Sequence, residues 1–124
     1  MAVIRRKPRN VQLTQVSQLT ELAKEKPVLV DFWSRGCPAC RAMDGIVSEL
    51  AEEFEGSAHV VKVNLTDMPE SIQAFRLQGT PTFLVMTAKE DARKPTARFR
   101  ASGLVKKEIL AKALISAGAE TPDR

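Results

Sequence analysis

Cys37 and Cys40 are the only two cysteines of this 124-residue chain, and their spacing could support redox chemistry. Residues 28–30 (VLV) precede them and predict a buried strand, whereas apolar residues recur at helical spacing after them and predict an amphipathic helix. Both cysteines therefore fall at a strand-to-helix turn. Residues at positions i and i+3 share one helix face, so the two sulfur atoms can meet.

A cysteine at the N-terminus of a helix is well placed to ionise. Amide N–H groups without partners inside the helix, and the positive end of the helix dipole, favour the thiolate of Cys37 over the thiol. Pro38 fits the first helical turn, and Arg41 adds positive charge nearby. A Cys37 thiolate can attack a disulfide and Cys40 can resolve the mixed disulfide, so the pair is predicted to exchange with other disulfides.

A metal site is the alternative for this pair. Two cysteines three positions apart cannot form a disulfide scaffold, so they are catalytic, redox-sensing or metal-binding. Zinc and iron–sulfur sites need about four protein ligands, or three with an open position. The chain adds one histidine, His59, which we expect to lie away from the cysteines, solvated and without a role. We therefore predict no metal.

The chain resembles the thioredoxin family in several stretches that occur in family order. These are residues 29–33 (LVDFW), 37–40 (CPAC), 59–64 (HVVKVN) and 79–83 (GTPTF), and Gly103. The resemblance implies an α/β thioredoxin fold, with a central mixed sheet of about five strands flanked by about four helices. It also implies a thiol–disulfide oxidoreductase that reduces protein disulfides, with Cys37 as nucleophile, Cys40 as resolving cysteine and no cofactor beyond the redox-active disulfide.

Asp31 lies inside an apolar strand, where an uncompensated carboxylate would be costly to bury. It could instead lie at an exposed strand end or form a salt bridge with Lys62. In the family, a buried aspartate at this position helps deprotonate the second cysteine, and desolvation that raises its pKa is the physical basis of that role. The resemblance therefore implies that Asp31 is catalytic, with Lys62 as its electrostatic neighbour.

The resemblance also implies a substrate-binding surface around the cysteines. X–Pro bonds are usually trans, but the family proline that matches Pro81 is cis and lies beside the cysteines, where the preceding Thr80 offers its backbone to a substrate polypeptide. Trp33 would pack beside the active-site loop, although a core position is the ordinary fate of a strand tryptophan. Gly103 is either a turn glycine or part of an apolar rim around Cys37.

The active-site sequence departs from the commonest thioredoxin pattern, Trp-Cys-Gly-Pro-Cys. Gly36 replaces the tryptophan and removes an apolar contact surface beside the nucleophile, which puts the use of general thioredoxin partners in doubt. With Pro38 next to Cys37, the amides of Ala39 and Cys40 are both free to point at the Cys37 sulfur. We therefore hypothesise a more oxidising pair than a Gly-Pro site. Proline directly after the first cysteine also resembles glutaredoxins and a periplasmic oxidant, although the flanking sequence does not. Gly45 stands where thioredoxins often have a helix-kinking proline.

The charge distribution and the composition of the chain constrain its domain organisation. The chain is 44% apolar and 27% charged, as in a soluble globular domain, and no apolar run reaches the eighteen or so residues of a membrane span. Four basic residues and no acidic ones lie in the first ten positions, so the rest of the chain is neutral. We predict a flexible basic leader (1–9), a thioredoxin-like domain (10–118) and a C-terminal tail (119–124). Nucleic-acid or membrane contact by the leader is an alternative that we do not predict.

The expected partners are disulfide-containing proteins, with a thioredoxin reductase or a low-molecular-weight thiol as electron donor. No apolar signal-peptide segment follows the basic leader, so we expect a cytoplasmic protein, and nothing in the sequence demands more than a monomer. Two other functions stay open. One is a glutaredoxin-like or oxidising exchange activity. The other is a redox-regulated binding module for a dedicated partner.

The secondary structure expected from periodicity and turn residues follows the order β-α-β-α-β-α-β-β-α. The expected strands are residues 11–13, 28–33, 60–65, 82–86 and 97–101. The first expected helix begins at Thr14 or Ser17 and ends before Pro27. The other three expected helices span residues 37–54, 69–75 and 105–117. A charged loop, 89–95, should join the last two strands as a hairpin.

Overall fold

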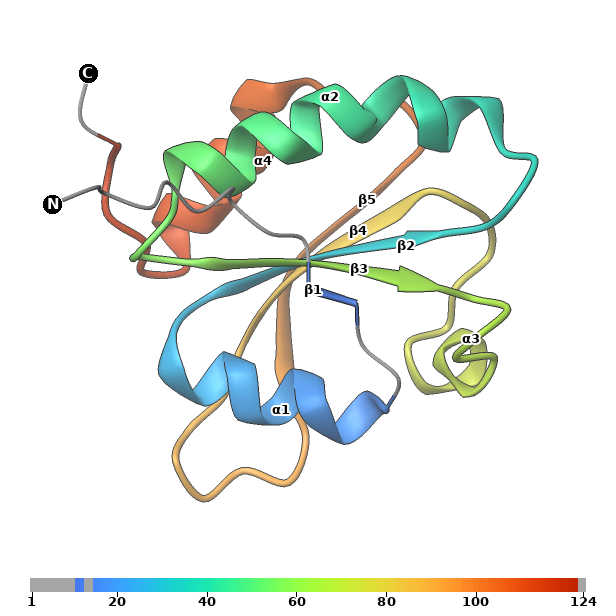
Figure 1. Ribbon diagram of the computed structural model, residues 1–124. Coiled ribbons are helices and arrows are strands. Elements are labelled where there is room, and N and C mark those ends of the chain that lie inside the picture. The colour runs from blue at the N-terminus through green and yellow to red at the C-terminus, as the bar shows by residue number, and fades with distance from the viewer. Residues whose placement is uncertain (1–10, 13–14, 123–124) are drawn as a thin grey trace, which may run out of the picture.

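The computed structural model describes residues 11–12 and 15–122, so the predicted leader and Leu13 and Thr14 lie outside the described residues. Five strands and four helices follow one another in the described chain in the predicted order, with the last two strands consecutive (Figure 1). The strands are β1 (Val11–Gln12), β2 (Val28–Trp33), β3 (His59–Asn64), β4 (Thr82–Thr87) and β5 (Thr96–Ser102). The helices are α1 (Val16–Glu25), α2 (Pro38–Glu53), α3 (Glu70–Ala74) and α4 (Lys107–Ser116).

The strands form one mixed sheet with the order β1-β3-β2-β4-β5. β2 lies at its centre, pairing in parallel with β3 and antiparallel with β4. Its residues 28–32 are all buried, which explains its β-branched and aromatic composition. The sheet confirms the predicted five-stranded mixed architecture and the predicted parallel pairing of β2 with β3.

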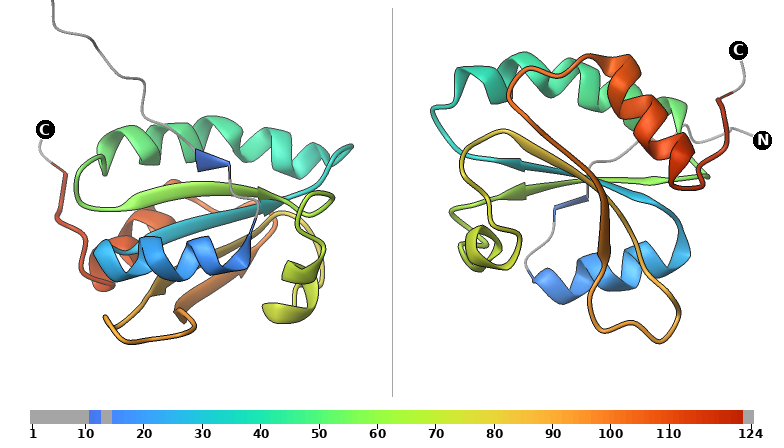
Figure 2. Two further views of the ribbon diagram at one scale, coloured as in Figure 1. Left: turned by 60° about the horizontal axis from the view of Figure 1, so that its bottom comes forward. Right: turned by 180° about the vertical axis from the view of Figure 1, so that it is seen from behind.

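Two helical layers cover the sheet. α2 and α4 lie over one face, and α1 and α3 lie over the other (Figures 1 and 2). Alternation along β2 divides its side chains between two cores: Leu29 packs in the core under α2 and α4, whereas Val28, Val30 and Phe32 pack in the core under α1. By the same period of two, Asp31 faces the α2 layer, where the cysteines lie.

The ends of two elements differ in detail from the predictions. α2 starts at Pro38 with Cys37 as its N-cap, and the chain leaves it near Gly56, which has a φ of +95°. Ala119, the first residue of the predicted tail, is buried in the core with α4. None of the helices in the described part of the chain is both long and apolar enough to cross a membrane.

Candidate active site

The two cysteines are joined as a disulfide at the N-terminus of α2, with 5.2 Å between their Cα atoms. Cys37 is the N-cap residue in an extended conformation, and its sulfur accepts a hydrogen bond from the Cys40 amide at 3.1 Å. A side-chain acceptor at this position satisfies one of the free amides of the first turn. Of the two amides that the sequence leaves free, only that of Cys40 donates to this sulfur in the disulfide. Cys40 itself is buried, and Cys37 is half-buried.

The loop before β4 lies directly against Cys37. The Thr80–Pro81 peptide bond is cis, as predicted, and the Thr80 carbonyl oxygen is 3.5 Å from the Cys37 sulfur. Two contacts fix this loop: the Ser34 and Thr80 hydroxyls are 2.7 Å apart, and the Gly103 amide donates to the Pro81 carbonyl at 2.9 Å. Four of the predicted site residues (Cys37, Thr80, Pro81, Gly103) are therefore brought together.

Ser34 was not among the predicted site residues. Its bond to Thr80 links residues 46 positions apart, so no local pattern could indicate it. The available signal was its place as a polar residue directly after the central strand and before the cysteines. Its hydroxyl orients the residue whose carbonyl faces the reactive sulfur.

Asp31 is 1% exposed, and its Oδ1 atom is buried without a hydrogen-bond partner in the described structure. The exposed strand end considered from the sequence is therefore wrong. Burial raises the pKa of Asp31 from 3.8 to about 7; the positive charge of Lys62 opposes this shift and the negative charge of Asp44 adds to it. Near neutral pH this carboxyl can therefore either hold or release a proton.

Lys62 is the cross-strand neighbour of Asp31 in the β2–β3 register, but its ammonium group is bound elsewhere. It donates to Asp44 Oδ1 at 2.8 Å and lies 5.4 Å from the centre of the Trp33 ring. The salt bridge to Asp31 considered from the sequence is therefore absent from the structure. Lys62 influences Asp31 through space, as an electrostatic neighbour, while a different carboxylate carries its hydrogen bond.

Asp44 was missed in the sequence analysis. It lies on α2, four positions after Cys40, and therefore on the same helix face one turn further along. That spacing was the signal that could have indicated it. Together, Asp44 and Lys62 form an ion pair beside the buried carboxyl of Asp31.

The surface around the disulfide is open and partly apolar. Trp33 is half-buried, with its indole N–H buried and without a partner in the described structure. Gly36, at the tryptophan position of the common pattern, is exposed with a φ of +68°, and a Cβ atom there would meet nothing within 4 Å. Gly103 is followed by Leu104, an exposed apolar side chain (71%) that was not predicted. Pro38 and Ala39 form the first turn of α2.

The described residues contain no group of three or more His, Cys, Asp or Glu that could hold a metal ion. His59 pairs with Val28 at the start of β2, whereas the cysteines follow the other end of that strand, so it is remote from them as predicted. It is half-buried rather than fully solvated, and its Nε2 atom is 2.9 Å from Glu25 Oε1.

Comparisons with known proteins agree with this geometry. The family model named Thioredoxin matches residues 10–114. The chain is 39% identical over 80 residues to a thioredoxin of Pyropia yezoensis, covering 64% of this chain and 75% of the relative. It is 35% identical over 82 residues to a thioredoxin of Porphyra purpurea, covering 60% and 77% respectively.

Among solved structures, a mutant thioredoxin from Halobacterium salinarum superposes with a TM-score of 0.74 at 20% identity, covering 97% of this chain and all of the other (100%). This likeness concerns the fold alone. The match over residues 10–114, together with a Cys-x-x-Cys pair at a helix N-terminus, shows that the chain belongs to the thioredoxin family and is a thiol–disulfide oxidoreductase.

Proposed function

We propose that this chain reduces disulfides of other proteins, with Cys37 as the attacking thiolate and Cys40 as the resolving thiol. One observation carries the proposal: the Cys37 sulfur caps α2, accepts the Cys40 amide and lies beside the Thr80 carbonyl. The amide and the helix N-terminus stabilise negative charge on the sulfur, which favours both attack and departure as a thiolate.

The reaction balances as two successive exchanges. In the reduced protein, the Cys37 thiolate attacks one sulfur of the substrate disulfide and forms a mixed disulfide with it, and the other substrate sulfur leaves as a thiolate. The Cys40 thiol then loses its proton and attacks the Cys37 sulfur, so that the substrate sulfur bound to Cys37 leaves as the second thiolate. The substrate gains two electrons and the protein is left with the Cys37–Cys40 disulfide that the structure contains.

Asp31 is the proposed acceptor of the Cys40 proton. Its side chain faces the α2 layer, its Oδ1 atom is free of hydrogen bonds, and its pKa of about 7 permits proton uptake near neutral pH. No hydrogen bond joins Asp31 to either cysteine in the described structure. Asp31→Asn should therefore slow resolution, by about a hundredfold, while leaving the first attack by Cys37 nearly unchanged. Equal slowing of both steps in stopped-flow experiments would argue against this role.

The proposed substrate groove lies between the cysteines and the loop before β4. Thr80 and Pro81 would bind the substrate backbone, and Trp33, Gly36 and Gly103 would form its apolar sides. Lys62, Pro38 and Ala39 have supporting roles, through the charge near Asp31 and the shape of the first turn. The hydrogen bond between the Ser34 and Thr80 hydroxyls holds Thr80 at the edge of this groove.

The partners belong to the same proposal. Thioredoxins generally receive electrons from a thioredoxin reductase, and we propose such a reductase or a low-molecular-weight thiol as the donor, with the protein acting as a monomer in the cytoplasm. No cofactor is needed in this scheme, because the dithiol holds the two electrons. Fractionation of cells that produce the tagged chain, and its reduction by a purified reductase with NADPH, would test the compartment and the donor.

The reduction potential decides between the reductase and the oxidising alternative. We would equilibrate the protein against a glutathione or dithiothreitol series and follow Trp33 fluorescence, since this indole lies beside the active-site turn. A value near the roughly −270 mV of thioredoxin would support a general reductase, whereas about −200 mV or higher would indicate an oxidising or glutathione-coupled role.

A double Cys37→Ser, Cys40→Ser variant separates the enzyme from a redox-regulated binding module. An enzyme loses all disulfide reduction in this variant. A binding module keeps its partner, which pull-down with the variant would show. Full retention of the biological effect by the variant would contradict the proposed function.

A further inference from the structure

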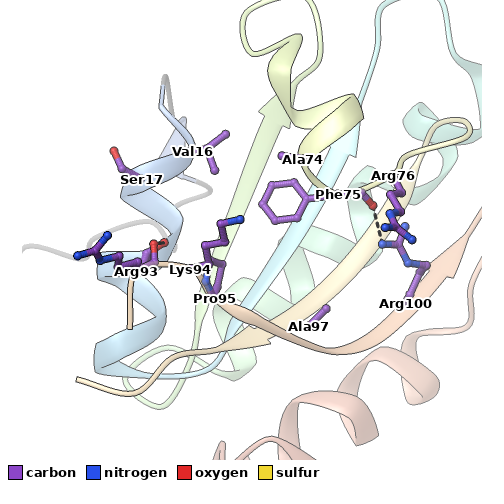
Figure 3. A pocket seen from close by; sticks show the side chains of 11 residues that line it. Val16, Ser17, Ala74, Phe75, Arg76, Arg93, Lys94, Pro95, Ala97 and Arg100 are labelled. Atoms are coloured by element: carbon purple, nitrogen blue, oxygen red, sulfur yellow. Dashed lines mark hydrogen bonds between the residues drawn. The ribbon is translucent and has the colours of Figure 1, made fainter. Parts of the chain in front are cut away.

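A pocket of about 520 Å³ lies on the face of the sheet opposite to α2 and α4. Its walls are α1, α3 and the segment of residues 88–95 that joins β4 to β5 (Figure 3). The segment is tied to α1 at two points: the Ala88 amide donates to the Ala23 carbonyl at 3.1 Å, and the Thr20 hydroxyl donates to the Arg93 carbonyl at 3.4 Å. These bonds hold the pocket open as part of the fold.

The lining of this pocket is cationic. Arg76, Arg93, Lys94 and Arg100 line it, and no acidic residue does so in the described structure. None of these four side chains is among the ion pairs of the described residues, all of which involve other cations. Positive charges gathered in one concavity without a carboxylate attract an anion.

The floor of the pocket is apolar and centred on Phe75. The Phe75 ring is half-buried and packs against Phe32, with 5.4 Å between ring centres and an angle of 42° between ring planes. Figure 3 shows the ring between Lys94 on one side and Arg76 and Arg100 on the other. Arg100 is anchored there by a bond from its guanidinium to the Phe75 carbonyl at 2.6 Å. The aromatic surface and the cations therefore form one site.

An irregularity in β5 explains why Ala97 lies on the same face as Arg100. The register between β4 and β5 shifts between Val85 and Met86, so that Phe99 pairs with Val85 but Ala97 pairs with Met86. Such a bulge reverses the alternation of side chains along the strand. Ala97 and Arg100 consequently line the pocket, while Phe99 packs against the core under α2 and α4.

We propose that this pocket binds a small aromatic anion: a planar ring joined to a phosphate or carboxylate group, as in a mononucleotide or an aryl phosphate. The ring would stack on Phe75, and the anionic group would pair with the guanidinium of Arg100 or Arg76 and the ammonium of Lys94. The volume lies in the range of small-ligand sites. The site is separate from the cysteines, so the proposal is independent of the redox function.

The first test is a titration of the intact protein, followed by NMR, with adenosine monophosphate and with phenyl phosphate. Adenosine and inorganic phosphate serve as the uncharged and the ring-free controls. We expect at least one of the two aromatic phosphates to shift the amide signals of residues 74–76 and 94–97, and to bind at least about tenfold more tightly than both controls. Comparing the two aromatic phosphates then identifies the ring. Equal affinity for either control, or shifts confined to other residues, would overturn the proposal.

Variants give the second test. Lys94→Gln and Phe75→Leu should each weaken binding of the tighter aromatic phosphate by about tenfold. The matched control is Arg98→Gln, the same loss of charge on the same strand as Arg100. Arg98 donates instead to the Thr87 hydroxyl at 2.9 Å and does not line this pocket. Unchanged disulfide reduction would show that each variant is folded. If Arg98→Gln weakened binding as much as Lys94→Gln, overall charge rather than this pocket would bind the anion, and the proposal would fail.

Discussion

The two ends of α2 use charged groups in opposite ways. At the N-terminal end, the buried carboxyl of Asp31 lies beneath the helix without a hydrogen bond to its Oδ1 atom. At the C-terminal end, Lys107 of α4 binds both Glu49 and Glu53 of α2, and all three side chains are partly open to solvent. The Asp31 carboxyl is thus buried away from water without a charged partner, whereas Lys107 and the two glutamates are paired although water can reach all three.

This difference separates chemistry from packing. Burial raises the pKa of Asp31 to about 7, into the range where it can exchange a proton with a thiol. The two glutamates raise the pKa of Lys107, but this group is already charged at neutral pH, so its function there is to join α2 to α4. Substitutions at the N-terminal end of α2 should therefore have large effects, and substitutions at its C-terminal end should have small ones.

Replacement of the nucleophile should have the largest effect. Cys37→Ser should lower the rate of disulfide reduction by roughly a thousandfold or more, because a serine hydroxyl does not ionise at neutral pH and cannot exchange with a disulfide. The measurement is turnover of a protein disulfide with dithiothreitol as reductant. The control is Cys40→Ser, which keeps the attacking sulfur and should accumulate a mixed disulfide visible by mass spectrometry. An adduct on Cys40 in the Cys37→Ser variant instead would reverse the assigned roles.

Removal of the buried charge should stabilise the fold at alkaline pH. The folded chain holds the Asp31 proton up to a pKa of about 7, whereas the ordinary value is 3.8. Between these values the unfolded chain releases a proton that the folded chain keeps, so the free energy of unfolding falls as the pH rises and levels off above the folded-state pKa. Asp31→Asn removes this penalty. We expect a gain on the order of 4 kcal/mol at about pH 8 that vanishes near pH 3.

Urea unfolding of both proteins across this pH range measures the effect. Asp67→Asn, a change of the same kind at an exposed residue after β3, is the control and should leave the pH dependence unaltered. A gain for Asp31→Asn that is equal at all pH values would mean that folding does not raise the pKa of Asp31, and that packing rather than charge explains the result.

Asp44 offers a smaller change at the same end of α2. Asp44→Asn removes a negative charge near Asp31 and releases Lys62 from its 2.8 Å bond, and both changes favour the ionised form of Asp31. The pKa of Asp31 should fall, by roughly one unit or less. Carboxyl-carbon NMR of Asp31 against pH measures it. Glu52→Gln, at an exposed position further along α2, should leave this pKa unchanged. An increase in the pKa of Asp31 would show that Asp44 acts mainly by positioning Lys62 close to it.

The sequence predicted what depends on local patterns. Periodicity of two and of 3.6 residues indicated the strands and helices in the correct order, and the strand-to-helix turn located Cys37 at the N-terminus of α2. The family resemblance supplied the cis bond before Pro81, which local propensity would have assigned as trans. Asp31 was expected to be costly to bury, and its raised pKa agrees with that expectation.

The remaining features depend on contacts between distant segments. Lys62 and Asp44 are 18 positions apart, and Ser34 and Thr80 are 46 apart. Lys62 could have paired with either nearby aspartate. Only the packed structure shows that its ammonium group reaches the exposed Asp44 and leaves the buried Asp31 unpaired. The cationic pocket combines three segments of the chain, and a bulge in β5 brings Ala97 rather than Arg98 to it.

The C-terminal end of α2 provides the smallest expected effect. Lys107→Met keeps most of the apolar stem of the side chain and removes its charge, so it deletes the two bonds to Glu49 and Glu53 with little loss of packing. Because these groups are partly exposed, we expect a loss of only about 0.2–1 kcal/mol in the free energy of unfolding near neutral pH.

The raised pKa of Lys107 means that this contribution is fully present below its ordinary value of 10.5 and is lost as the pH rises through the folded-state pKa. Urea unfolding at low and high salt measures it, and the difference between the proteins should shrink with salt. A loss as large as the Asp31→Asn gain would contradict the contrast between the two ends, because it would mean that paired charges in solvent matter as much as an unpaired charge in the core.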